Sequence, residues 1–329
     1  SQREFGQRHR NRCMPRFRFL CRSKVGFHTQ MRFLPLLLVV AVLMARPQAF
    51  DQVIPPGNNF DKAQFRLWIP NDAGTLRAAL ILTTGSNGDG RPMVDDPLWQ
   101  SLATRYKLAL VGCQLTDKPH EESFIEQYAN VSQGSGQALL SALTELAVQS
   151  RHPELAGAPL LLWGMSAGGE FNYEFVAWKP ERVIAFVANK GGIYYTALVP
   201  HAARSVPGLL FTGGNDLEFR TSTINGLFAI NRRAGALWAL AEEPGVGHVV
   251  GRSKDMAAIF FEDVLALRLD DQGVIKAIAE KSGFVGDLKA KTFEAMANRS
   301  APNVPTAWLP TARVARAWQA LVTDKPFEP

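Results

Sequence analysis

The chain has 329 residues and a formal net charge of +6, but its basic residues are concentrated at the start. Residues 1–50 contain ten Lys or Arg and one acid, which leaves a net charge of −3 on residues 51–329. A mildly acidic main part lacks the basic surface that nucleic-acid binding requires, so we expect no nucleic-acid partner. Only one cysteine, Cys113, lies beyond residue 50, and the histidines there show no ligand spacing, so we expect neither an internal disulfide nor a metal site.

The beginning of the chain has the layout of an export signal preceded by extra sequence. From Met31 onward come a basic residue, an apolar run of about a dozen residues and small residues near Ala49, which is typical of a secretory signal peptide. The run is too short to form a stable membrane span. We therefore expect residues 31–49 to be a signal peptide, residues 1–30 to be a disordered, non-native upstream extension, and the mature protein to be secreted or periplasmic. The alternative for residues 1–30 is a basic arm that binds nucleic acid.

Beyond residue 50, short apolar runs alternate with amphipathic segments. Apolar runs without polar alternation are typical of strands buried on both faces, which occur in parallel sheets covered by helices on either side. The expected strands are 65–70, 77–85, 108–115, 158–164, 183–192, 208–214 and 237–242, and the expected helices are 97–107, 136–150, 168–179, 223–236 and 254–268. This pattern predicts a single α/β domain over residues 50–329, with a mostly parallel central sheet and helices on both faces.

The end of the chain is expected to depart from this alternation. From about residue 270 we expect a helical tail, in which residues 306–322 form a loop followed by a C-terminal helix. We interpret Trp308 and Trp318 as packing residues rather than binding residues.

A serine lies between the expected strand 158–164 and the expected helix 168–179. Gly164-Met165-Ser166-Ala167-Gly168 matches the G-x-S-x-G motif, and the strand before it and the helix after it are the context that gives this motif meaning. A nucleophilic serine in such a turn has a strained backbone, and side chains two positions before and after would collide with it. We therefore predict Ser166 as a nucleophile at the carboxyl end of the sheet.

A serine needs a general base, and the position of each histidine relative to the strands decides between the candidates. His248 follows the strand at 237–242, so it lies at the same edge of the sheet as Ser166. His152 and His201 precede their strands and are disfavoured, whereas His120 follows a strand and can line the pocket. We predict His248 as the base.

The base needs an acid to orient it. Asp216 follows the strand at 208–214 and is the predicted acid, with Glu218 as the alternative. The chain order Ser166, Asp216, His248 is the order expected for a nucleophile, acid and base on an α/β-hydrolase sheet.

Two backbone N–H groups are expected to stabilise the oxyanion. Ala167 supplies one, because it follows the nucleophile at the amino end of a helix. The glycine-rich loop 82–92 follows another strand and supplies the second, which we assign to Ser86 with Asn87 as the near alternative. The loop lacks the lysine and the spacing of a phosphate-binding P-loop.

Taken together, these segments resemble the α/β-hydrolase family. The residues that carry the resemblance are TTGSNGDG, GMSAGG, GGND and GVGH, which follow expected strands in this order between about residues 60 and 270. Within the family the chain is similar to secreted esterases of the polyhydroxybutyrate depolymerase, feruloyl esterase and dienelactone hydrolase type. The resemblance implies hydrolysis through an acyl-enzyme without a metal or organic cofactor. One departure is the oxyanion loop, which reads TTGSNG where many of these esterases have His-Gly.

These observations lead to the expectation of a secreted serine hydrolase that cleaves small or polymeric carboxylic esters. A peptidase or amide hydrolase would use the same residues, but peptidases of this fold commonly carry a large extra domain. The alternative from another class is a non-catalytic binding protein on the same scaffold, which would be expected to have a broken triad. The acyl and alcohol specificity depends on loops and does not follow from the sequence.

Overall fold

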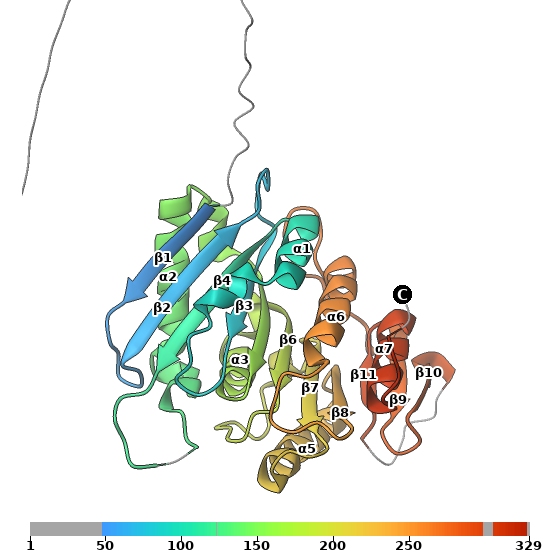
Figure 1. The fold of residues 1–329 in the computed structure, drawn as a ribbon. Coiled ribbons are helices and arrows are strands. Elements are labelled where there is room, and N and C mark those ends of the chain that lie inside the picture. The colour runs from blue at the N-terminus through green and yellow to red at the C-terminus, as the bar shows by residue number, and fades with distance from the viewer. Residues whose placement is uncertain (1–47, 123, 299–304, 328–329) are drawn as a thin grey trace, which may run out of the picture. The chain divides into compact units, whose positions relative to one another are not determined.

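The computed structural model describes residues 48–122, 124–298 and 305–327 (Figure 1). The expected upstream extension, residues 1–30, and nearly all of the expected signal peptide, residues 31–49, lie outside these ranges. The last two residues of that segment, Gln48 and Ala49, belong to the first strand. Within the described ranges, no helix is both long enough and apolar enough to cross a membrane.

An eight-stranded sheet forms the centre of the fold, with the strand order β1-β2-β4-β3-β5-β6-β7-β8. Strands β4, β3 and β5 to β8 run parallel to one another, whereas β1 and β2 are antiparallel to their neighbours. The bounds are β1 (Gln48–Ile54), β2 (Lys62–Ile69), β3 (Ala78–Thr83), β4 (Leu108–Thr116), β5 (Leu160–Met165), β6 (Val183–Asn189), β7 (Gly208–Gly213) and β8 (Trp238–Glu243). The predicted mostly parallel sheet is therefore confirmed.

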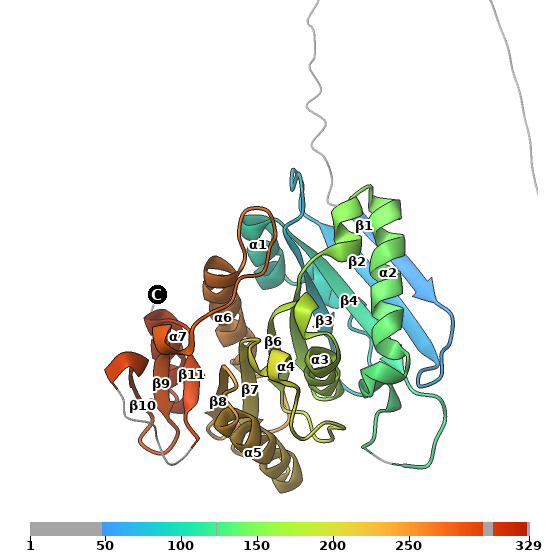
Figure 2. The same ribbon diagram turned by 180° about the vertical axis from the view of Figure 1, so that it is seen from behind.

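Helices cover both faces of this sheet, as predicted (Figures 1 and 2). Helices α1 and α6 lie over the face seen in Figure 1, and α2 and α3 lie over the face seen in Figure 2. The bounds are α1 (Pro97–Tyr106), α2 (Ser135–Ser150), α3 (Ala167–Trp178), α4 (His201–Arg204), α5 (Glu218–Arg233) and α6 (Ser253–Arg268).

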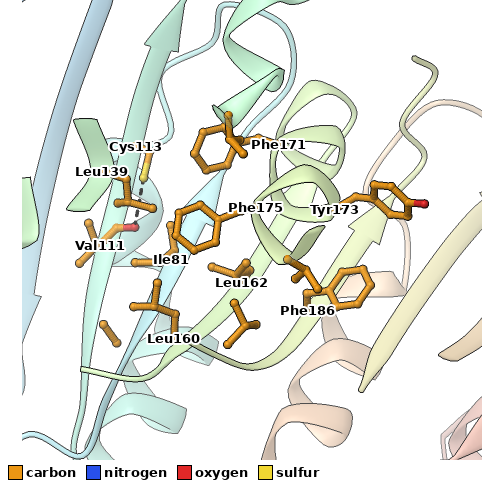
Figure 3. Packing of buried hydrophobic residues seen from close by; sticks show 14 of the residues in the cluster. Ile81, Val111, Cys113, Leu139, Leu160, Leu162, Phe171, Tyr173, Phe175 and Phe186 are labelled. Atoms are coloured by element: carbon orange, nitrogen blue, oxygen red, sulfur yellow. Dashed lines mark hydrogen bonds between the residues drawn. The ribbon is translucent and has the colours of Figure 1, made fainter. Parts of the chain in front are cut away.

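Side-chain alternation along the strands explains why both faces can be buried. In β3, Ile81 packs in the cluster with α2 and α3, whereas its neighbours Leu80 and Leu82 pack in the cluster with α1 and α6. Successive side chains of a strand point to opposite faces, so an uninterrupted apolar strand supplies two cores at once. Figure 3 shows the first of these cores, where Phe175 of α3 lies beside Ile81 and Phe171 belongs to the same cluster.

The region beyond residue 270 is not the helical tail that we expected. In the part that the structure describes, it contains a three-stranded antiparallel sheet of order β10-β9-β11, followed by the α-helix α7. The bounds are β9 (Phe284–Asp287), β10 (Thr292–Ala295), β11 (Ala307–Leu309) and α7 (Ala312–Val322). Strands of three or four residues are too short to produce a readable period, which is why the sequence did not predict them.

The interpretation of Trp308 and Trp318 as packing residues is confirmed. Both side chains are fully buried. The indole of Trp308 donates to the carbonyl of Glu280, and the indole of Trp318 donates to the carbonyl of Leu240 in β8. The second bond attaches α7 to the central sheet.

Candidate active site

Ser166 lies on the turn that joins β5 to α3, with backbone angles of φ 55° and ψ −126°. A positive φ is uncommon for a residue other than glycine and marks a strained position. A Cβ at Gly164 would lie 2.2 Å from the carbonyl oxygen of Gly168, and a Cβ at Gly168 would lie 2.6 Å from the carbonyl oxygen of Thr84. Both contacts are too short to exist, so glycine is required at both positions, as predicted. The groups that a side chain would meet are the backbone of Gly168 and Thr84, however, and not Ser166 as we expected.

Hydrogen bonds hold this turn against the sheet. The backbone N–H of Ser166 donates to the carbonyl of Asn189 at the end of β6 over 2.7 Å. The carbonyl of Ser166 accepts the N–H groups of Gly169 and Glu170, which begins the hydrogen bonding of α3. The strained residue is therefore fixed on both sides, and its hydroxyl lies at the carboxyl edge of the sheet.

The predicted base and acid lie beside this hydroxyl. Nε2 of His248 is 2.9 Å from Oγ of Ser166, and Nδ1 of His248 is 2.8 Å from Oδ2 of Asp216. His248 lies on the loop between β8 and α6, and Asp216 follows β7. Three segments far apart in the sequence are thus joined by one continuous chain of hydrogen bonds.

The strand order of the sheet and the turn that carries Ser166 together identify the fold. The sheet is mostly parallel, with an antiparallel second strand. Ser166 follows β5, Asp216 follows β7 and His248 follows β8. This chain order of serine, acid and histidine is the order found in α/β-hydrolases. The chain has the α/β-hydrolase fold.

Comparisons with known proteins show similarity to several solved α/β-hydrolase structures. The poly(3-hydroxybutyrate) depolymerase LpqC of Bordetella parapertussis is 18% identical, with a TM-score of 0.49, over 67% of this chain and 90% of its own. An esterase of Pyrobaculum calidifontis is 14% identical, with a TM-score of 0.47, over 67% and 85% of the two chains. A putative dienelactone hydrolase of Klebsiella pneumoniae is 18% identical, with a TM-score of 0.43, over 68% and 98%. No family model and no curated protein sequence matches the chain.

The surroundings of Asp216 favour its ionised form. Burial alone would raise the pKa of this carboxyl, but hydrogen bonds from His248 and from the backbone N–H of Leu217 outweigh burial and lower the pKa. The guanidinium of Arg220, 3.3 Å from Oδ1, acts in the same direction. An ionised Asp216 that accepts from Nδ1 keeps Nε2 of His248 free to take a proton from Ser166.

The alternative residues lie elsewhere in this α/β-hydrolase fold. Glu218 is exposed in the first turn of α5. The side chain of His152 contacts Glu154 ahead of β5, and His201 lies in α4 ahead of β7. His120 contacts Asp117 and Glu122 in the loop after β4, and it is not among the residues that line the cleft at Ser166.

Two backbone N–H groups are free to bind an oxyanion. Ala167 begins α3, and Ser86 lies in the loop after β3; neither N–H donates to an acceptor in the part of the chain that the structure describes. The backbone N–H of Asn87, by contrast, donates to the hydroxyl of Tyr128 over 3.3 Å. This observation favours Ser86 over Asn87, because the Asn87 group is already occupied.

An open cleft of about 590 Å³ lies over Ser166. Its walls come from the end of β5, from the loops after β3, β4, β6 and β8 and from the first turns of α3 and α5. The lining residues are Thr84, Gly85, Ser86, Gly88, Phe124, Glu126, Met165, Ser166, Glu170, Gly192, Phe219, Arg220 and His248. No group of three or more His, Cys, Asp or Glu that could hold a metal is found within the described ranges.

The loop that carries His248 is anchored by a buried ion pair that the sequence analysis missed. The ammonium of Lys190, at the end of β6, contacts the carboxylate of Glu243, at the end of β8, and both side chains are almost fully buried. The same carboxylate accepts the backbone N–H of Arg252, so it joins the beginning of the loop to its end. The pair therefore fixes both ends of the segment on which His248 is carried.

Glu170, one helical turn after Ser166, is an uncommon residue for a buried site. Its side chain is only 3% exposed. Burial raises the pKa of this carboxyl to about 8, although hydrogen bonds from the N–H groups of Gly192 and Ile193 partly oppose the shift. The carboxyl is therefore mostly protonated at neutral pH. No sequence pattern marks this burial, because an acidic residue in the first turn of a helix is ordinarily solvent-exposed.

The raised pKa of Glu170 predicts how stability depends on pH. The folded state binds the proton more tightly than the unfolded state, so the free energy of unfolding falls as pH rises from about 4.5 to 8. Glu170→Gln keeps the shape without a titrating proton, and we expect this variant to be more stable than the wild type by about 2–4 kcal/mol at pH 8.5. Urea unfolding at pH 5.5 and pH 8.5 measures this difference. Parallel pH dependence in the two proteins would show that the buried carboxyl is not protonated.

Proposed function

We propose that the protein is a secreted serine hydrolase that cleaves carboxylic esters through an acyl-enzyme intermediate. The observation that carries the proposal is the unbroken hydrogen-bond chain from Asp216 through His248 to Ser166, whose last member opens into a cleft. The export part of the proposal rests on the sequence of residues 31–49 alone.

The geometry supports the following steps. Oγ of Ser166 attacks the acyl carbon while Nε2 of His248 takes its proton. The N–H groups of Ala167 and Ser86 bind the oxyanion of the tetrahedral intermediate. His248 then returns the proton to the leaving alcohol, and a water activated by the same imidazole releases the acid from Ser166. Asp216 orients His248 and stabilises the imidazolium.

A panel of esters tests this function. The purified protein is assayed with p-nitrophenyl esters of increasing chain length, with a feruloyl ester and with a peptide p-nitroanilide. We expect turnover of esters and none of the anilide. Cleavage of the anilide with kcat/KM equal to that of the best ester would make the protein a peptidase or amide hydrolase, and no turnover of any substrate would favour a binding protein.

A further inference from the structure

One wall of the cleft over Ser166 carries two carboxyl groups that form no ion pair with any residue that the structure describes. Glu126 precedes a short turn in the loop after β4 and is 9% exposed, and Glu170 lies on α3 and is 3% exposed. Both line the same cleft as Ser166 and His248. Buried carboxylates are normally paired or bound to a metal, because an isolated buried charge is costly.

The hydrogen bonding of the two groups is incomplete. The carboxylate of Glu126 has no hydrogen-bond or ion-pair partner among the residues that the structure describes; its backbone carbonyl accepts the hydroxyl of Tyr195. In Glu170, Oε1 accepts two backbone N–H groups, but Oε2 is buried without a partner. Among the described residues, the wall therefore lacks a cation and hydrogen-bond donors beside the carboxylate of Glu126, and it leaves Oε2 of Glu170 without a partner.

Arg220 lines the same cleft, but its charge is already matched. Its guanidinium lies 3.3 Å from Asp216 and over the rings of Phe124 and Phe219, with 5.7 Å and 5.0 Å to the ring centroids. These contacts hold Arg220 beside the acid of the triad, and it forms no ion pair with Glu126 or Glu170 within the described ranges.

We propose that this wall binds an ammonium group of the substrate, so that the preferred ester carries a positive charge. Glu126 would contact the ammonium directly, and Glu170 would lie behind it. This inference rests on the proposed function of the cleft and adds a substrate class to it. A cation supplies both the charge and the N–H donors that the wall lacks.

Protonation of Glu170 is coupled to this binding. Burial is the largest cause of its raised pKa, and the nearby charge of Glu126 raises it further, whereas Arg220 lowers it. An ammonium bound beside the two carboxyls favours the ionised form, so binding should release a proton near neutral pH. The titratable or charged side chains that interact electrostatically with Glu170 are Glu126, Tyr128, Tyr194, Tyr195 and Arg220.

Matched ester pairs test the preference. Ethyl 6-aminohexanoate and ethyl heptanoate differ only by an ammonium in place of a methyl group on the acyl side. Butyrylcholine and 3,3-dimethylbutyl butyrate form a pair on the alcohol side that tests the charge alone, because the quaternary ammonium of choline has no N–H group. We expect kcat/KM to be about tenfold higher for the charged member of at least one pair, and this ratio to fall toward one at high salt. A ratio of one or less in both pairs would overturn the proposal.

Substitutions locate the effect. Glu126→Gln keeps the shape and removes the charge, so we expect the charged-to-neutral ratio of kcat/KM to fall about tenfold. Glu121→Gln removes the same charge from an exposed position on the same loop, outside the cleft lining, and is expected to leave the ratio unchanged. An equal fall of this ratio in the two variants would mean that the overall electrostatic field of the protein, and not this wall of the cleft, causes the preference.

Calorimetry separates the proposal from the esterase function. n-Hexylammonium is titrated into the wild type at pH 7.5 in two buffers of different ionisation enthalpy. We expect binding with proton release, weaker binding in Glu126→Gln, and binding without proton release in Glu170→Gln. Such binding in a protein that hydrolyses no ester would uphold the cation site and reject the esterase, whereas ester hydrolysis without hexylammonium binding would do the reverse.

Discussion

Ser166→Ala is expected to lower kcat for ester hydrolysis by a factor of about 10⁵–10⁶. In the proposed mechanism Oγ of Ser166 forms the covalent bond to the acyl group, and among the described residues no second nucleophile is hydrogen-bonded to His248. KM should change little, because alanine leaves the walls of the cleft unchanged. The strained φ of 55° remains in the variant, so its stability should be close to that of the wild type.

The control for this prediction is a test that the variant is folded. Circular dichroism and thermal unfolding should show the Ser166→Ala variant folded as the wild type is. A folded variant that kept more than a few per cent of wild-type kcat would contradict the assignment of Ser166 as the nucleophile.

Asp216→Asn is expected to lower kcat by a factor of about 10⁴ without unfolding the protein. The amide has the size of the carboxylate, but its NH₂ group can donate to Nδ1 of His248. The imidazole would then carry its proton on Nε2, which is the nitrogen that must accept the proton of Ser166.

The pH dependence of kcat in Asp216→Asn distinguishes a wrong tautomer of His248 from a mere shift in the position of residue 216. Loss of orientation and of imidazolium stabilisation should leave a small residual rate that rises with hydroxide concentration. Glu218→Gln serves as the matched control, because Glu218 is exposed in α5 and should tolerate the change with no loss of activity. A tenfold loss or less in Asp216→Asn would mean that another group orients His248.

The sheet and the convergence of Ser166, Asp216 and His248 were predictable for one physical reason. Strands buried on both faces are apolar throughout, as β5 and β7 are, so the sequence marks where each strand ends. Parallel strands bring their carboxyl ends to one edge, and Ser166, Asp216 and His248 each follow such an end. Reasoning from strand ends therefore brought together residues up to 82 positions apart.

The missed elements lack this signal. Strand β1 alternates between exposed and half-buried residues and overlaps the segment that reads as an export signal. Helix α5 begins at Glu218, whereas the sequence predicted a beginning at residue 223, because the first turn of this helix is largely exposed and shows no apolar spacing. Glu126 comes from an irregular loop whose path no periodicity fixes, and a fully buried Lys190 runs against the usual exposure of lysine.

Covalent labelling of Ser166 tests the central claim most directly. The wild type and His248→Ala are incubated with a fluorophosphonate, and the modified residue is identified by mass spectrometry of peptides. We predict one phosphonyl group per protein, attached to Ser166, with labelling at least about a thousandfold slower in His248→Ala. An unlabelled wild type, or equal labelling rates in the two proteins, would contradict the claim that His248 and Asp216 make this serine a nucleophile.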